Sequence, residues 1–156
     1  MNIQDIMSKD VQIVSPDTIV IDVAKKMQKR DCGSILVAKD DRLMGVITDR
    51  DLALRCVAES RHPSETTAEQ VMTGEILYCR DTDEVETVAL DMTKNKVRRL
   101  PVLDKDKRLV GIVSLGDLAA NSADHLVCGR ALGYICADPV SAKTEQNNIS
   151  KFPIAS

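Results

Sequence analysis

Apolar residues along the chain follow two different periods, and each period occurs twice. In residues 20–27 and 85–92 they recur at every third or fourth position, which is the spacing of one face of an α-helix. These two helices are expected to begin near Asp17 and Thr82, residues of the type that caps a helix N-terminus. The apolar positions are Val20, Val23, Ala24 and Met27 in the first helix, and Val85, Val88, Ala89 and Met92 in the second.

β-Rich runs surround each of these helices. A short extended stretch comes before each one, at residues 11–14 and 76–79. After each helix come two short runs separated by a polar turn, KDDR or DKDKR, which predicts a hairpin. A second helix is expected directly after each hairpin. The predicted hairpin strands are Ser34–Ala38 with Leu43–Thr48, and Leu100–Leu103 with Leu109–Ser114.

The two halves of the chain are copies of one unit. Asp5 aligns with Gln70 at a shift of 65 positions, and Gly45 aligns with Gly111 at a shift of 66. The extra residue falls in the hairpin turn, where a repeated fold tolerates an insertion. The unit reads as β-α-β-β-α, so the predicted fold class is α/β. One unit alone is too small to bury both faces of its sheet, so the two are expected to pack about an internal pseudo-twofold axis.

This organisation predicts four segments. Residues 1–59 form repeat 1, residues 60–69 a linker or short helix entry, residues 70–122 repeat 2, and residues 123–156 a tail of uncertain structure. At the end of the tail, residues 146–156 resemble residues 94–104, as if a third copy began there.

The composition excludes several classes of function. Apolar residues make up 44% of the chain and charged residues 29%, which is typical of a globular protein. Aromatic residues make up only 2%, too few for a platform on which nucleic-acid bases stack. The formal charge of −3 is too close to balance to attract DNA or RNA by bulk charge. We therefore expect no nucleic-acid partner.

The thiols and histidines indicate neither a metal site nor a catalytic site. The five cysteines are spread along the chain without a C-x-x-C pair, and there are only two histidines. No apolar run is long enough to cross a membrane, and the amino terminus has no secretory pattern. We expect a cytoplasmic protein that has reduced thiols, that is not an enzyme and that needs no cofactor.

The most specific local pattern is GVITDRD, residues 45–51, with its copy GIVSLGD, residues 111–117. In each, a hydroxyl residue ends a strand, and an aspartate follows three positions later. One interpretation is structural, because such a pair caps the helix that follows. The other is ligand binding. The amides of a helix N-terminus suit a phosphate, and an aspartate can accept hydrogen bonds from both hydroxyls of a ribose.

The duplicated pattern resembles a cystathionine-β-synthase-type (CBS) domain, and the pair resembles a Bateman module, over about residues 1–120. The resemblance implies that adenosine nucleotides bind in clefts between the two copies. It assigns Thr48 and Ser114 to ribose or phosphate, and Asp51 and Asp117 to the ribose hydroxyls. The remaining nucleotide-binding candidates are the apolar Ile47, Pro101 and Val113, and the basic Arg50, Arg98 and Arg99.

The first copy departs from this pattern at the basic positions. Gly33 and Ser34 stand where the second copy has Arg98 and Arg99, so the two copies should differ in phosphate affinity. Arg50 could compensate, and the second copy has Gly116 in its place. Each arginine could equally belong to a solvated rim.

Two hypotheses about function follow. The first is a regulatory module that senses AMP, ADP, ATP or S-adenosylmethionine and passes a conformational change to an unknown regulated protein. The second is an interaction or dimerisation scaffold in which the motif serves only to cap helices. The family resemblance also implies a homodimer.

Overall fold

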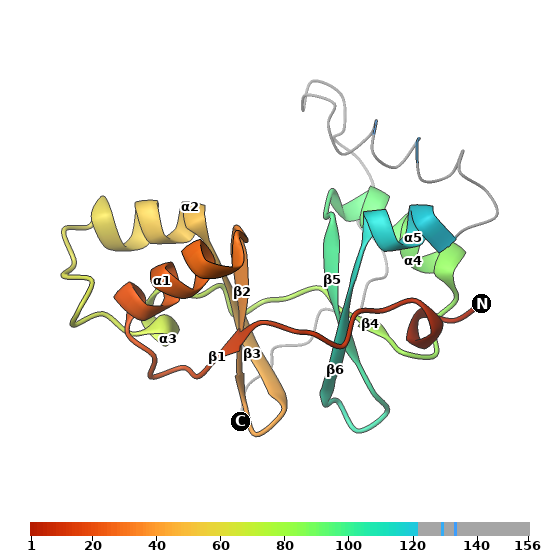
Figure 1. Ribbon diagram of the computed structural model, residues 1–156, viewed down its shortest axis with the longest axis horizontal. Helices are drawn as coiled ribbons and strands as arrows, with labels where there is room; N and C mark the ends of the chain where they lie inside the picture. Colours follow the sequence, from red (N-terminus) through yellow and green to blue (C-terminus); the bar gives the residue numbers. More distant parts are fainter. Residues whose placement is uncertain (122–128, 130–132, 134–156) are drawn as a thin grey trace. The chain divides into compact units, whose positions relative to one another are not determined.

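The computed structural model describes residues 1–121, together with residues 129 and 133 (Figure 1). The predictions for the tail, including the third copy at residues 146–156, lie outside the described residues. The chain divides into two compact units. One, the first-repeat unit, contains Val11–Ile76, and the other, the second-repeat unit, contains Met1–Asp10 and the described residues from Leu77 on.

The first-repeat unit is a three-stranded sheet with helices. The strand order is β1-β2-β3, in which β1 is parallel to β2 and β2 is antiparallel to β3. A buried cluster that includes Val23, Ile35 and Ile47 forms its core. The strands are β1 (Ile13–Val14), β2 (Ser34–Lys39) and β3 (Arg42–Thr48). The helices are α1 (Val20–Arg30), α2 (Asp49–Asp51), its π-helical continuation η2 (Leu52–Val57), and α3 (Ala68–Val71).

The second-repeat unit has the same plan. Its strand order is β4-β5-β6, again with one parallel and one antiparallel pair. Its core includes Val88, Met92, Val102 and Leu118. The strands are β4 (Cys79–Arg80), β5 (Arg99–Leu103) and β6 (Leu109–Ser114). The helices are the 3-10 turn η1 (Ile3–Asp5), α4 (Val85–Asn95) and α5 (Leu115–Asn121). The predicted α/β class and the β-α-β-β-α order are confirmed.

The first helix of each repeat begins three residues later than predicted. α1 starts at Val20 and α4 at Val85, so Asp17 and Thr82 do not cap them. The reason is that main-chain carbonyls from distant segments satisfy the first helical amides. The Val20 amide donates to the Thr66 carbonyl at 2.8 Å, and the Val85 amide donates to the Met1 carbonyl at 3.2 Å.

One residue of the predicted apolar face also differs between the two helices. Ala89 on α4 is buried, as expected, whereas Ala24 on α1 is exposed. The buried face of α1 therefore consists of Val20, Val23 and Met27 alone.

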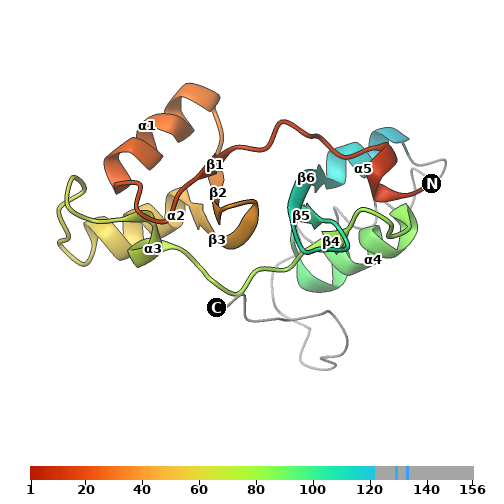
Figure 2. The same cartoon turned by 90° about the horizontal axis from the view of Figure 1, so that it is seen from below.

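The segment that leads into each repeat packs in the unit of the other repeat. We call residues 2–8 the first leader segment and residues 67–73 the second leader segment. Ile3 of the first leader is fully buried in the second-repeat core, and η1 lies beside α4 and α5 in both views (Figures 1 and 2). Ala68 and Val71 of the second leader are fully buried in the first-repeat core. The packed units therefore do not follow the repeat boundaries along the sequence.

Each leader also adds a bridge to the outer edge of its sheet. Ser8 and Ile112 exchange two main-chain hydrogen bonds of 2.9 Å. Thr73 and Val46 exchange the equivalent pair at 2.9 and 3.0 Å. The stretch at residues 60–69, which we expected to be a linker, holds buried Thr66 and Ala68 because it enters this contact.

A methionine of each leader lies against a glycine of the neighbouring strand. A Cβ atom added at Gly111 would lie 2.6 Å from Sδ of Met7 and 3.0 Å from the carbonyl oxygen of Ser8. A Cβ atom added at Gly45 would collide with the side chain of Met72 in the same way. Both strands therefore need glycine at this position so that the leader can approach.

We predict that Gly45→Ala and Gly111→Ala each lower the free energy of unfolding by about 1–3 kcal/mol, because each overpacks a leader contact. Urea denaturation measures the change. Gly74→Ala is the control, because a Cβ atom there would meet only the Met44 carbonyl oxygen, at 3.9 Å. Equal stability of all three variants would contradict the close approach of the leaders.

Candidate functional site

In the first repeat, Thr48 and Asp51 join strand β3 to helix α2 through reciprocal hydrogen bonds. Oδ2 of Asp51 accepts from the Thr48 amide at 2.8 Å and from its hydroxyl at 2.9 Å. In return, the Asp51 amide donates to Oγ1 of Thr48 at 3.1 Å. This arrangement is a capping box, which satisfies amides that the start of a helix leaves without partners.

The second repeat has the same junction between β6 and α5. Oδ2 of Asp117 accepts from the Ser114 amide at 2.8 Å and from its hydroxyl at 2.6 Å. The Asp117 amide donates to Oγ of Ser114 at 3.1 Å. The capping interpretation of the motif therefore holds in both copies, and the ligand interpretation depends on what the carboxylates can still accept.

The second carboxylate oxygen distinguishes the two aspartates. Oδ1 of Asp51 lies 3.6 Å from Nη2 of Arg55, so it is engaged in an ion pair. Within the described residues, no side chain pairs with Oδ1 of Asp117. The second repeat thus presents an acceptor that the first repeat does not.

The residues across the strand confirm the predicted equivalence of positions. The Asp49 amide donates to the Gly33 carbonyl at 3.0 Å, and the Leu115 amide donates to the Arg98 carbonyl at 2.9 Å. On β5, Arg99 pairs directly with Ser114. Directly paired residues of two strands share a face of the sheet, so Arg99 and Ser114 are neighbours there.

In the first repeat, Ser34 pairs with Thr48 just as Arg99 pairs with Ser114 in the second. The first repeat therefore has no basic side chain at this paired position.

The charges at the two junctions differ accordingly. Arg98 and Arg99 are exposed and have no ion pair within the described residues. At the first junction, the Asp49 carboxylate comes so close to Gly33 that an added Cβ atom would lie 3.2 Å from its Oδ2. Arg50 is exposed there, and its amide donates to Oδ1 of Asp49 at 2.8 Å.

Two of the three apolar candidates, Ile47 and Val113, belong to the two cores. Ile47 and Val113 have no exposed side-chain surface, and Pro101 is also buried. The Pro101 carbonyl accepts a hydrogen bond from Sγ of Cys79 at 3.8 Å. The side chains of Ile47 and Val113 therefore pack in the cores next to the strand-to-helix junctions.

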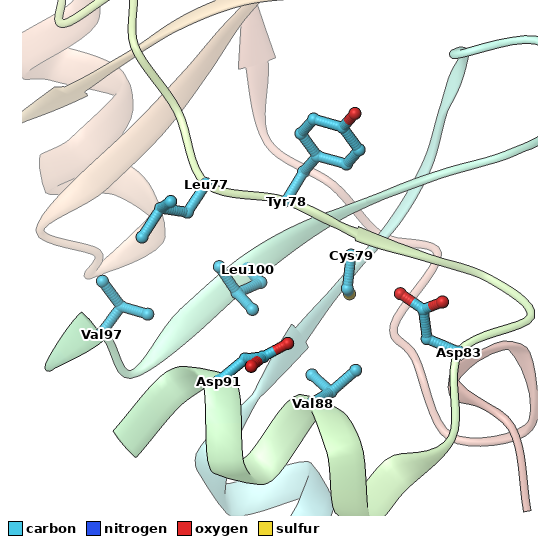
Figure 3. Close-up of a pocket in the computed structure, with 8 residues that line it drawn as sticks. All are labelled: Leu77, Tyr78, Cys79, Asp83, Val88, Asp91, Val97 and Leu100. Carbon is cyan, nitrogen blue, oxygen red and sulfur yellow. The ribbon is translucent and has the colours of Figure 1, made fainter. Parts of the chain in front are cut away.

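A small pocket opens in the second-repeat unit, and none of the ten predicted site residues lines it (Figure 3). With its open mouth included, the pocket holds about 280 Å³ of empty space. Its lining residues are Leu77, Tyr78, Cys79, Asp83, Val88, Asp91, Val97 and Leu100. The sequence contained one signal for this pocket. Asp91 is an acidic residue among the apolar residues that run from Val88 to Met92 on the helix.

Burial changes the titration of two groups in this pocket. Burial raises the pKa of Asp91, repulsion from Asp83 adds to the increase, and Lys94 opposes it. Burial likewise raises the pKa of the Cys79 thiol to about 12, with repulsion from Asp83 and Asp91 adding to it. A thiol with such a pKa stays protonated at neutral pH, so Cys79 is a poor nucleophile and a poor metal ligand.

Comparison with known proteins identifies the family. The family model described as "CBS domain" matches the chain twice, at residues 3–57 and 68–124. The chain belongs to the CBS-domain family. Its two CBS domains stand in tandem, as the repeat predicted. A curated relative, the CBS domain-containing protein YhcV of Bacillus subtilis, is 36% identical over 134 residues, which cover 86% of this chain and 94% of YhcV.

Solved structures of other CBS proteins have the same fold. The conserved CBS domain protein TA0289 of Thermoplasma acidophilum matches with a TM-score of 0.71 and 26% identity, over 86% of this chain and 75% of that one. CBSX2, solved in complex with AMP, matches with a TM-score of 0.65 and 27% identity, over 76% and 93%.

The CBS domain pair of MJ0100, solved with 5'-methylthioadenosine and S-adenosyl-L-methionine, matches with a TM-score of 0.64 and 26% identity, over 77% and 98%.

In the described part of the chain, no group of three or more His, Cys, Asp or Glu side chains is arranged to hold a metal ion. Of the helices described, none has the length and apolar character needed to cross a membrane.

We predict that Asp91→Asn stabilises the protein more at pH 7 than at pH 3.5. A raised pKa means that the folded state holds a proton that the unfolded state has lost. The stability that this proton contributes is therefore present below the ordinary value of 3.8 and is lost as the pH rises through the raised pKa. Urea denaturation of wild type and variant at both pH values measures the difference.

Glu86→Gln, an exposed change on the same helix, is the matched control. A difference between Asp91→Asn and wild type that does not grow with pH would show that the burial of Asp91 is not costly.

Proposed function

We propose that this CBS-domain pair is a regulatory module that binds an adenosine-containing ligand at its strand-to-helix junctions and carries out no chemistry of its own. The ligand class is AMP, ADP, ATP or S-adenosylmethionine, and the ligand is a signal and not a cofactor. The observation that carries the proposal is the junction of the second repeat. There, among the described residues, no side chain pairs with Oδ1 of Asp117, and the exposed Arg98 and Arg99 stand across the strand from the junction.

Asp117 suits the two adjacent hydroxyls of a ribose. A carboxylate has about four acceptor positions on its two oxygens, and the capping box uses two of them, both on Oδ2. Oδ1 can therefore accept hydrogen bonds from a ligand while the cap stays intact. A hydroxyl pair is a better partner than a phosphate here, because a second anion would be repelled.

Arg98 and Arg99 suit the phosphate of the same ligand. Arg99 lies directly across from Ser114 on the neighbouring strand, so its guanidinium can reach the ligand that Asp117 holds by its ribose. Hydrogen bonds between a guanidinium and a phosphate are charge-assisted and often bidentate. The first repeat has Gly33 and Ser34 in these positions, and the Asp49 carboxylate adds negative charge. We therefore propose that a nucleotide prefers the second repeat, although Arg50 supplies some positive charge at the first.

The complexes of related CBS proteins support the ligand class. CBSX2 binds AMP, and the domain pair of MJ0100 binds 5'-methylthioadenosine and S-adenosyl-L-methionine. All three compounds contain an adenosine group with ribose hydroxyls, which is the feature that Asp51 and Asp117 are proposed to hold. A ligand of this kind acts by population shift, because it stabilises the conformation that binds it best. The protein that responds to the change is unknown.

A scaffold without a ligand is the second candidate function. The two capping boxes favour it, because each hydroxyl and aspartate pair has a complete structural role with no ligand bound. Under this alternative the two junctions only hold the fold together, and the module acts through its surface.

We predict that at least one of AMP, ADP, ATP and S-adenosylmethionine raises the melting temperature. A ligand at about 100 times its Kd adds about 2.7 kcal/mol to the stability of the folded state. Asp117→Ala should lose most of this gain, while its unfolding free energy without ligand falls by only about 1 kcal/mol, the usual loss for a cap. Asp51→Ala is the matched control, because it removes the same cap from the first repeat and should keep most of the gain.

The proposed contact with the phosphate is tested with Arg99→Ser. This change gives the second repeat the residue that the first repeat has in the same position, Ser34. The affinity of this variant for AMP should fall by about tenfold or more, because a hydrogen bond to a charged group contributes about 1.5–3 kcal/mol. Its affinity for adenosine should not change. No thermal shift with any of the four compounds would favour the scaffold.

We also propose that the module works as a homodimer, since closed twofold dimers are the commonest soluble oligomers. Leu54 and Val57 of η2 support this, because their side chains are 48% and 70% exposed. Sedimentation equilibrium should give about twice the chain mass of 17.1 kDa, and Leu54→Ser with Val57→Ser should lower it. The mass of a single chain for the wild type would contradict the dimer.

A further inference from the structure

Arg55 connects the aspartate of the first repeat to the second leader segment. Its Nη2 atom lies 3.6 Å from Oδ1 of Asp51, one turn earlier on the same helix. Its Nη1 atom donates a hydrogen bond of 2.8 Å to the carbonyl oxygen of Val71, the last residue of α3. Only 16% of the Asp51 side chain and 39% of the Arg55 side chain are exposed. One guanidinium therefore joins the proposed ribose acceptor to the main chain of another segment.

Within the described residues, the second repeat has no equivalent of this connection. Four residues after Asp117 comes Asn121, whose side-chain amide donates to the main-chain carbonyl of Asp117 at 2.9 Å. Asn121 thus leaves the carboxylate of Asp117 alone. The two junctions share their capping box and differ in whether a positive side chain occupies the remaining oxygen.

The second leader is held at the sheet edge immediately after Val71. The Thr73 amide donates to the Val46 carbonyl at 2.9 Å, and the Val46 amide donates to the Thr73 carbonyl at 3.0 Å. Met72, between Val71 and Thr73, lies against Gly45. A change in the hydrogen bond between Arg55 and Val71 therefore acts directly on residues 71–73, which pair with the edge strand β3.

We propose that Arg55 competes with the ligand for Asp51. Binding of ligand to the first repeat is thereby coupled to how firmly the second leader is attached to the edge of the sheet. Ribose hydroxyls that bind Oδ1 of Asp51 displace the guanidinium, which weakens its bond to the Val71 carbonyl and loosens residues 71–73. The coupling is reciprocal, so any event that frees the leader also frees Asp51 for ligand. This inference rests on the proposed function, and it names the regulation of the same site.

The direct test measures adenosine binding to the first repeat alone, in the Asp117→Ala chain. Adenosine has no phosphate, so a change of charge at residue 55 neither adds nor removes an interaction with a phosphate. Arg55→Asn copies the second repeat and should tighten adenosine binding about two- to fivefold, the effect of removing one partly exposed ion pair. Arg55→Lys keeps the charge and should bind with an affinity between those of Arg55→Asn and wild type.

The reciprocal variant tests the same idea in the other unit. In the Asp51→Ala chain, Asn121→Arg places a guanidinium four residues after Asp117 and should weaken adenosine binding about two- to fivefold. This arm does not depend on the folding of Arg55→Asn.

Hydrogen exchange of the Met72 and Thr73 amides measures directly how stably the second leader is attached to the sheet edge. With Arg55 present, saturating adenosine should speed their exchange in the Asp117→Ala chain. In the Arg55→Asn variant their exchange should already be fast, and adenosine should not change it. A role of Arg55 that is only structural predicts fast exchange without tighter binding.

The outcomes separate this inference from the proposed function. If adenosine binds but Arg55→Asn leaves its affinity unchanged or weaker, the coupling through Arg55 is overturned and the ligand site stands. If the wild type binds neither adenosine nor any of AMP, ADP, ATP and S-adenosylmethionine, the proposed function is overturned and the coupling is overturned with it.

Discussion

Two aspartates each hold a point where a buried strand turns directly into a helix. A helix start leaves amides without partners, and here a hydroxyl and a carboxylate satisfy them reciprocally within four residues. The strand before each junction carries a fully buried side chain, Ile47 or Val113, which holds the end of the strand in position. The cap therefore always forms at the same point of the chain. Because the cap uses only one carboxylate oxygen, the other can serve a different partner. The proposed function depends on that second oxygen.

Duplication has given two junctions with one geometry and different surroundings. Thr48 and Asp51 face Gly33 and Ser34 across the strand, with Asp49 close by and Arg55 already paired to the acid. Ser114 and Asp117 face Arg98 and Arg99, and their acid has no side-chain competitor within the described residues. The same cap can thus stabilise both units, while the side chain across the strand from it is a serine in the first repeat and an arginine in the second.

Local periodicity and turn chemistry predicted much of this fold. The hairpins, the apolar faces of α1 and α4 and the two capping motifs all depend on residues close in sequence, so their patterns are visible in a single chain. The starts of α1 and α4 were wrong because the carbonyls of Thr66 and Met1, far away in sequence, replace the expected caps. The exchange of leader segments, the buried surroundings of Asp91 and the bridge from Arg55 to Val71 are also long-range contacts. No pattern of neighbouring residues predicts these contacts. Gly45 and Gly111 are a partial signal, because a glycine in a strand can indicate that another segment packs closely against it.

The most direct test of the central claim is isothermal titration with AMP and with 2′-deoxy-AMP. If Asp117 holds two ribose hydroxyls through Oδ1, removing one hydroxyl costs a hydrogen bond to a charged group, and the affinity should fall by about tenfold or more. The Asp117→Ala chain should bind both compounds weakly and with little difference between them. Equal and tight binding of AMP and 2′-deoxy-AMP by the wild type would contradict the account, because the aspartate would then not be reading the ribose.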